Sequence, residues 1–424
     1  MIWKTGSPFE EPQGDRRKCV RRLPVWCAPW AFAAALLQAG GIAGAFAQDT
    51  APRALEVPLS EEFILIPVRI GQADLKLALE PSSFMGVTLN RLADAKRAGI
   101  SRFEPIRIIG GGAGGQLGLR GSAVRGVPVE IAGARLTSLL MVPHEKSDLA
   151  QAFQGTSFDG YIGADLLNRM IVEVNYDEKR IRVVPPDQYV PPKGWSELPL
   201  RMVKGSPHLK VTLRFDDHST EATLYLYAMG HEGAVIDAQG NPQLQPPTGS
   251  RQVFIETVAV HYLGRAARIR SLELGSWSVP GPILTFPGQA VSSRLSAEGA
   301  HGYLGPEILR RFNFALDFPK RRILMQPNRS FDDQMDFDRC GLSFEFSRPE
   351  KALQVAHVLE GSPAQAAGLA VGDLILELNG KPTAALSRYD AYRMLRGRAG
   401  EAVRLKYRRG STVKEAALQK KILF

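Results

Sequence analysis

Two stretches of equal length decide the fold: "FDGYIGADLLNRMIVEVNYDEKRIRVV" (Phe158–Val184) and "AHGYLGPEILRRFNFALDFPKRRILMQ" (Ala300–Gln326). They align without a gap. Because chance seldom produces such a run of matches, the alignment indicates a duplicated domain. The matching pairs are Gly160 with Gly302, Tyr161 with Tyr303, Gly163 with Gly305, Leu167 with Leu309, Arg169 with Arg311, Tyr176 with Phe318 and Ile181 with Ile323.

Each copy has the same local pattern. A Gly-aromatic-aliphatic-Gly turn precedes a short helix, and two alternating strands follow around a charged turn ("DEKR" or "PKRR"). Further β-rich runs precede each copy, among them "EFILIPVRI" and "LKLALE" in the first half and "HLKVTLRF" and "EATLYLYA" in the second. A Pro-rich segment, "VVPPDQYVPPKGW", separates the halves and is typical of a linker. The pattern predicts a mainly β protein with two similar lobes.

The N-terminal segment is typical of an export signal. Five basic residues between Arg16 and Arg22 precede an apolar stretch from Val25 to Ala39, and Ala45-Phe46-Ala47 fits a cleavage site. We therefore expect residues 1–47 to be removed on export to the periplasm. The alternative is an N-terminal membrane anchor, which the glycines after Ala39 disfavour.

Composition narrows the function classes. The 424 residues suggest two or three domains, and the formal net charge of +10 is spread out rather than gathered with aromatic residues, so nucleic acid is not an expected partner. Of the three cysteines only Cys340 lies beyond the signal, which excludes an internal disulfide in the exported chain. No Cys–His spacing suggests zinc, and no cofactor is expected.

Two β lobes, each with an acid-bearing turn and a later apolar-apolar-Gly turn, resemble the aspartic peptidases. "FDGYIG" is similar to the pepsin-type pattern, and the run "IIGGGAGGQLGLRG" (108–121) resembles a retroviral protease flap. The arrangement from about 55 to 327 is most similar to the retropepsin-like aspartyl protease family of bacterial exported proteins. The resemblance implies two pepsin-like β-barrel lobes, at 55–185 and 196–327, joined by a linker at 186–195. The flap glycines would be Gly110, Gly111, Gly112, Gly114 and Gly115.

A nucleotide loop is the other interpretation of the glycine run. The run lacks the Lys-Ser/Thr ending of a P-loop, and no strand-GxGxxG unit with an acidic partner is present. Glycines in a hairpin are the better account.

The catalytic positions that the resemblance implies depart from the family. An aspartic peptidase needs two carboxylates that share a proton, each in Asp-Thr/Ser-Gly. The first half offers Glu80-Pro81-Ser82, and the alignment places Tyr227 opposite Glu80. Glu232 and Asp237 follow Tyr227 but lack the strand-end position. We therefore expect a degenerate dyad with little or no proteolytic activity. An active endopeptidase that uses Glu80 with a divergent partner is the alternative.

The C-terminal segment resembles a PDZ domain across residues 338–424, after a second linker at 328–337. "GSPAQAAGL", "GDLILELNG" and the near-"GLGF" stretch Gly341-Leu342-Ser343-Phe344 carry the resemblance. It implies that a loop of backbone N–H groups binds a chain-terminal carboxylate and that the peptide pairs with a strand. The peptide-binding residues would be Gly341, Leu342, Ser343, Phe344, Arg388, Met394 and Leu395.

These interpretations predict a small α+β PDZ domain after two aspartyl-protease-like lobes. The expected ligands are extended polypeptides, with free C-termini and an apolar last residue at the PDZ domain. A PDZ adaptor whose lobes only dimerise is a third possibility.

Overall fold

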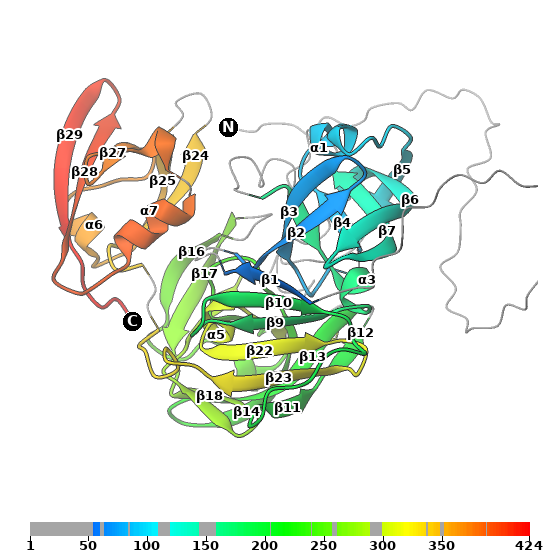
Figure 1. Cartoon of the computed structure of the whole chain (residues 1–424). Helices are drawn as coiled ribbons and strands as arrows, with labels where there is room; N and C mark the ends of the chain where they lie inside the picture. Colours follow the sequence, from blue (N-terminus) through cyan, green and yellow to red (C-terminus); the bar gives the residue numbers. More distant parts are fainter. Residues whose placement is uncertain are drawn as a thin grey trace, which may run out of the picture. The chain divides into compact units, whose positions relative to one another are not determined.

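The computed structural model describes residues 54–59, 63–83, 85–108, 119–143, 158–203, 205–238, 240–256, 261–288, 299–335, 338–347, 352–386 and 388–424. Strands dominate these ranges, and the helices are short (Figure 1). Among the described residues, none of the helices combines the length and apolar character that crossing a membrane requires.

The first half forms a curled seven-stranded sheet in the order β2-β3-β8-β4-β7-β6-β5. An additional pairing between β2 and β6 curls it toward a barrel. The strands are β2 (Leu65–Ile70), β3 (Ala73–Leu79), β4 (Val87–Leu89), β5 (Glu104–Ile108), β6 (Leu119–Ile131), β7 (Ala134–Pro143) and β8 (Gly160–Ile162).

The second half forms a ten-stranded sheet in the order β16-β17-β20-β15-β21-β14-β13-β18-β19, with β12 (Arg201–Val203) paired to β13. The other strands are β13 (Ser206–Arg214), β14 (Ser219–Leu226), β15 (Ala234–Ile236), β16 (Arg251–Glu256), β17 (His261–Arg268), β18 (Ser271–Leu274), β19 (Trp277–Pro280), β20 (Ile283–Pro287) and β21 (Gly302–Leu304).

The repeat in the sequence is a repeat in topology. In the first half β3 runs parallel to β8, β8 is antiparallel to β4, and β4 runs parallel to β7. In the second half β14 runs parallel to β21, β21 is antiparallel to β15, and β15 runs parallel to β20. A short helix follows each copy, α3 (Ala164–Leu167) after β8 and α5 (Pro306–Leu309) after β21.

A six-stranded sheet joins the halves in the order β1-β10-β9-β22-β23-β11, with β9 paired to β22. Its strands come from both halves, so the two cores are continuous in one large apolar cluster. The strands are β1 (Leu55–Pro58), β9 (Ile171–Asn175), β10 (Arg180–Val184), β11 (Ser196–Pro199), β22 (Phe312–Asp317) and β23 (Arg322–Pro327).

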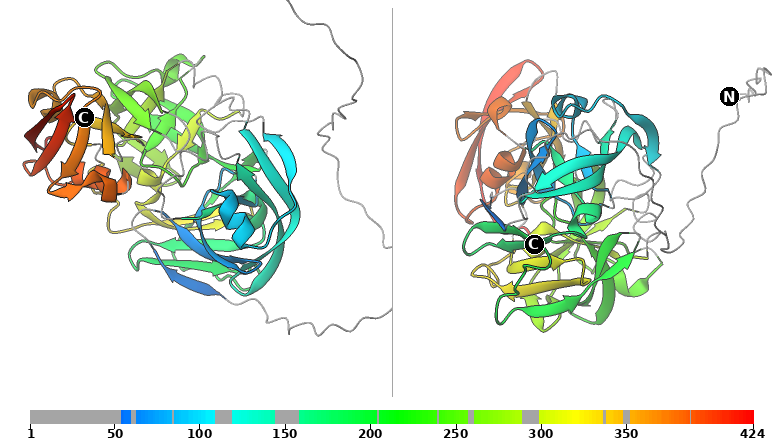
Figure 2. Two further views of the ribbon diagram at one scale, coloured as in Figure 1. Left: turned by 90° about the horizontal axis from the view of Figure 1, so that it is seen from above. Right: turned by 45° about the vertical axis from the view of Figure 1, so that its right-hand side comes forward.

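The C-terminal sheet has the order β24-β25-β26-β28-β29 and its own apolar core. In Figure 2 its orange and red strands lie next to the green strands of the second half, in agreement with contacts between β16 and β25. The strands are β24 (Leu342–Ser347), β25 (Ala352–Val358), β26 (Leu374–Leu378), β27 (Lys381–Pro382), β28 (Ala402–Arg409) and β29 (Thr412–Gln419). The remaining helices are α1 (Leu92–Arg97), α6 (Pro363–Ala366) and α7 (Arg388–Leu395), with 3₁₀ turns η1 (Pro242–Leu244) and η3 (Thr383–Ala385).

The structure confirms the coarse fold class, a mainly β protein with curled sheets and a small C-terminal α+β module. Alternation of buried and exposed residues explains why these segments form strands. In β3, for example, Ala73, Leu75 and Leu77 are buried while Asp74 and Lys76 are exposed. The exact domain boundaries remain predictions.

Candidate functional site

Two regions gather the residues that the sequence singles out, and the first is the junction of the halves. Glu80 follows β3, and its N–H donates to the carbonyl oxygen of Ile162 at 2.9 Å. Tyr227 follows β14, and its N–H donates to the carbonyl oxygen of Leu304 at 3.0 Å. Since Ile162 and Leu304 are themselves equivalent in the repeat, Glu80 and Tyr227 make equivalent backbone hydrogen bonds.

Glu80 is buried, with 5% of its surface exposed. Its Oε1 accepts hydrogen bonds from the Ser82 hydroxyl and from the Ser82 N–H at 3.0 Å. Its Oε2 has no hydrogen-bond partner of standard geometry within the described ranges. Burial raises the pKa of Glu80 to about 7, although Ser82 and the backbone N–H groups of Ala228 and Met229 favour the charged form.

Tyr227 lies against the ring of Tyr303, with 4.8 Å between the ring centroids. Burial raises the pKa of Tyr227 well above its ordinary value, and the negative charges of Glu80 and Glu232 raise it further. Glu232 is itself buried, and its Oε2 accepts the His231 N–H at 3.0 Å. Asp237 is buried after β15, where its N–H donates to the carbonyl oxygen of His301 at 2.8 Å. The junction therefore holds Glu80 in a buried contact with the backbone of the second half.

The flap glycines Gly110, Gly111, Gly112, Gly114 and Gly115 lie outside the described residues, as does the expected signal, 1–47. Within the ranges given above, no group of three His, Cys, Asp or Glu side chains is arranged to hold a metal ion.

The second region is a groove between β24 and α7. β24 is the last strand of its sheet, and α7 packs on it through Leu395, which is fully buried with Leu342 and Phe344. The N–H of Phe344 points across the groove to the hydroxyl of Tyr392 on α7, 3.5 Å away. Among the described strands β24 pairs with β25 alone, so this N–H lies on the edge that another strand would join.

Of the expected peptide-binding residues, Leu342 and Ser343 line a pocket at the end of this groove. Met394 packs against the module's core. Phe344 and Leu395 serve the core more than the groove surface, because their side chains are fully buried. Arg388 is the first residue of α7, as expected, but its side chain is not among those that the structure describes.

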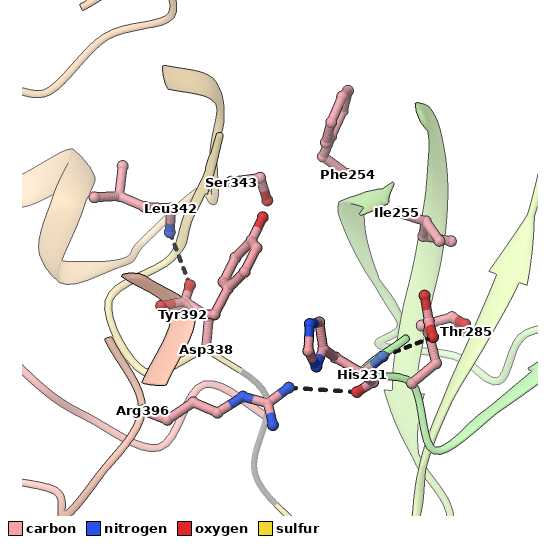
Figure 3. A pocket seen from close by; sticks show the side chains of 10 residues that line it. His231, Phe254, Ile255, Thr285, Asp338, Leu342, Ser343, Tyr392 and Arg396 are labelled. Carbon is pink, nitrogen blue, oxygen red and sulfur yellow. Dashed lines mark hydrogen bonds between the residues drawn. The ribbon is translucent and has the colours of Figure 1, made fainter. Parts of the chain in front are cut away.

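The loop before β24 encloses a carboxylate of the chain itself. Asp338 Oδ1 accepts the N–H of Cys340 at 2.8 Å. Its Oδ2 accepts the N–H of Leu342 at 2.7 Å, and this bond is drawn in Figure 3. The Gly341 N–H also favours the Asp338 charge. Burial nevertheless raises the pKa of Asp338 to about 6.

A pocket of about 60 Å³ opens at this loop, between α7 and the second half (Figure 3). Arg396, after α7, closes one side, since its guanidinium bonds Glu307 at 2.9 Å and the carbonyl oxygen of His231 at 3.3 Å. The lining residues are His231, Glu232, Phe254, Ile255, Thr285, Asp338, Leu342, Ser343, Tyr392 and Arg396.

The sequence did not predict a role for Asp338, Tyr392 or Arg396. A local signal exists for Asp338, because an Asp side chain commonly accepts the N–H two residues on. Tyr392 lies three residues before Leu395, so helical periodicity places both on neighbouring positions of one face. For Arg396 no local signal exists, because its partners are more than 80 residues away.

Comparison with known proteins supports the assignment of this module. A family model described as the PDZ domain matches residues 354–409, which span β25 to β28. The C-terminal module is a PDZ domain.

Curated relatives share only about a fifth of the chain. A "Probable CtpA-like serine protease" of Staphylococcus haemolyticus is 26% identical over 92 residues, which is 22% of this chain and 18% of the relative. A protein of the same name from Staphylococcus aureus (strain bovine RF122 / ET3-1) is 26% identical over 95 residues, 22% of this chain and 19% of that one. This chain thus matches less than a fifth of the length of these relatives. A solved PDZ domain protein from Parabacteroides distasonis is 22% identical, covers 21% of each chain and has a TM-score of 0.19.

These findings overturn the functional interpretation from the sequence. The relatives are named serine proteases, and the matching family is the PDZ domain, so the interpretation as an aspartyl-protease-like protein is wrong. The comparisons give no support to a retropepsin-like assignment of the two halves. The degenerate pattern at Glu80 and Tyr227 resembles a peptidase only through a turn-and-repeat arrangement, which describes topology and not chemistry.

Proposed function

We propose that the PDZ domain captures an extended polypeptide segment by adding it as a strand to the open edge of β24. The observation that carries this proposal is the edge itself. The N–H of Phe344 faces α7 instead of β25 and donates to the Tyr392 hydroxyl at 3.5 Å, a long hydrogen bond that a carbonyl oxygen of an incoming chain can replace. PDZ domains bind peptides and C-termini in this manner, which supports a polypeptide ligand.

The end of the groove offers a small apolar surface, made by the ring of Tyr392 and by Phe254 and Ile255 of β16. Polar residues lie beside it, among them Asp338 and Ser343. The sequence favours an apolar last residue with a free carboxylate. The apolar part of that expectation has support in these lining residues, and the carboxylate part depends on the loop around Asp338.

The test is fluorescence anisotropy with labelled decapeptides, randomised except for one apolar position, against the purified protein. The best binder should lose at least tenfold in affinity when two alternate peptide nitrogens are methylated, because each methyl group removes a ladder hydrogen bond. Tyr392→Trp adds bulk to the groove and should weaken binding. Val413→Trp, at an exposed site on β29, is the matched control. Strand addition would be contradicted if binding survives methylation of the odd-numbered peptide nitrogens and also survives methylation of the even-numbered ones.

The names of the relatives favour a second candidate function, peptide capture in the service of proteolysis. The test incubates the purified protein with an unfolded substrate and with a fluorophosphonate that labels reactive serines. Cleavage together with labelling would support this second function. If the protein shows no cleavage and no labelling, peptide capture without proteolysis is the function that stands.

A further inference from the structure

The loop that would receive a ligand carboxylate forms an anion-binding site from its backbone N–H groups. Gly341 has φ of +76°, a conformation that favours glycine, and this turns the N–H groups of Cys340, Gly341 and Leu342 toward one point. A Cβ on Gly341 would come within 2.2 Å of the Ser362 Cβ, so the position has neither the backbone freedom nor the space for another residue.

That point is already occupied. Both carboxylate oxygens of Asp338 accept N–H groups of the loop, at 2.7 and 2.8 Å, and only 8% of the residue is exposed. The Asp338 side chain therefore holds the place that the terminal carboxylate of a bound chain would take. A segment of the same polypeptide supplies the anion.

A second carboxylate at this loop would meet two obstacles. The donors are engaged, and the charge of Asp338 would face a like charge in a poorly solvated site, where repulsion is strong. Arg396 lines the same pocket, but Glu307 already binds its guanidinium at 2.9 Å. A chain end would thus find the N–H groups of Cys340 and Leu342 already engaged and would add a second negative charge beside Asp338.

An internal segment would avoid both obstacles. Its backbone is neutral, so it can pair with β24 and pass Asp338 without adding charge. Beyond Asp338 the pocket continues to Phe254 and Ile255, which can contact the next apolar side chain. The cavity volume of about 60 Å³ suits one small side chain.

We propose that Asp338 makes this PDZ domain select internal extended segments of a polypeptide over free C-termini. The inference rests on the proposed function, since it specifies which part of a polypeptide the groove accepts. Asp338 acts as a specificity-determining residue by excluding a second carboxylate from the loop.

The experiment uses one decapeptide pool with an apolar last residue in three forms: with a free carboxylate, with an amide, and followed by Gly-Ser-Gly-Ser-amide. Anisotropy at pH 7.5 compares the full-length protein with Asp338→Ala and Asp338→Asn, and Glu415→Gln at an exposed site on β29 is the charge-matched control. We expect the unaltered protein and the control to bind the amide and extended forms at least fivefold more tightly than the free acid. Both Asp338 variants should bind the free-acid form at least tenfold more tightly than the unaltered protein does.

The outcomes separate the two proposals. If the unaltered protein prefers the free acid and amidation abolishes binding, the inference about Asp338 is wrong although peptide capture stands. The inference about Asp338 is also wrong if the Asp338 variants rank the three peptide forms by affinity in the same order as the unaltered protein. If no form binds to any variant whose circular dichroism matches the unaltered protein, strand addition at β24 itself is refuted.

Discussion

Glu80 at the junction of the halves and Asp338 in the PDZ domain begin from the same local arrangement. Each is a buried acid that accepts the N–H of the residue two positions on, Ser82 or Cys340. In each case burial raises the pKa, to about 7 for Glu80 and about 6 for Asp338.

The two sites differ in how the rest of the loop is oriented. Gly341, with its positive φ, turns further N–H groups onto Asp338, so both oxygens are satisfied. Glu80 is followed by Pro81, which has no N–H, and its Oε2 has no partner of standard geometry among the described residues. One glycine with a positive φ can thus convert a simple turn into an anion site, whereas in the turn with Pro81 one oxygen of Glu80 has no such donor among the described residues.

The largest expected effect is at Glu80. A carboxyl whose pKa is higher in the folded state binds its proton more tightly there. Its stabilising contribution is therefore complete below the unfolded pKa of about 4.5 and is lost as the pH rises through about 7. Glu80→Gln removes the charge and keeps an acceptor for Ser82, so the free energy of unfolding at pH 8 should rise by about 3 kcal/mol. Urea denaturation at pH 5 and pH 8 measures this.

Glu178→Gln, at a side chain 54% exposed, is the control and should change little at either pH. An equal effect of Glu80→Gln at both pH values would contradict the assigned pKa.

Arg396 offers the next test, because it links the PDZ domain to Glu307 and also lowers the pKa of Asp338. In Arg396→Met, Glu307 keeps Arg310 but loses its partner on the PDZ domain. We expect about 2 kcal/mol less unfolding free energy at pH 7.5. The loss should shrink in acid, since Arg396 is the main group that holds the pKa of Glu307 below its ordinary value against the opposing effect of burial. Arg393→Met, three residues earlier and 58% exposed, is the control in the same denaturation series.

The pH dependence of peptide binding probes Asp338 directly. Near pH 5 Asp338 is mostly neutral, because its pKa is about 6, and its repulsion of a free acid is removed. The unaltered protein should therefore bind the free-acid pool about tenfold more tightly at pH 5 than at pH 7.5. Anisotropy titrations of Asp338→Asn should show no such change. If the pH dependence of binding persists in that variant, another titrating group causes it.

The smallest effect is expected at Ser82. Ser82→Ala removes one of the two hydrogen bonds to Glu80 Oε1 and should lower the unfolding free energy at pH 8 by about 1 kcal/mol. It should also raise the pKa of Glu80 further. Ser278→Ala is the matched control, because its hydroxyl bonds Glu273 at 3.0 Å in an exposed setting. A loss of equal size in both variants, measured by urea denaturation, would show that burial adds nothing at Glu80.

Some features could be predicted because their signals are local. The repeat at Gly160 and Gly302 and the PDZ pattern near Gly341 depend on residue spacing, which the chain carries in any conformation. Alternation of apolar residues likewise predicts strands such as β3. The functional interpretation failed because a turn and a repeat describe topology, and topology does not specify chemistry.

Residue order alone carries the signals for the β-rich duplicated halves and the PDZ domain, and it places acids at positions 80 and 338. The environment of those acids is set by folding. Folding sets Glu80 against Ala228 and Met229 and closes Asp338 within its own loop beside Arg396. The physical reason is that a carboxyl group's pKa and partners depend on burial and on the direction of nearby N–H groups, and distant segments supply both only when the chain folds.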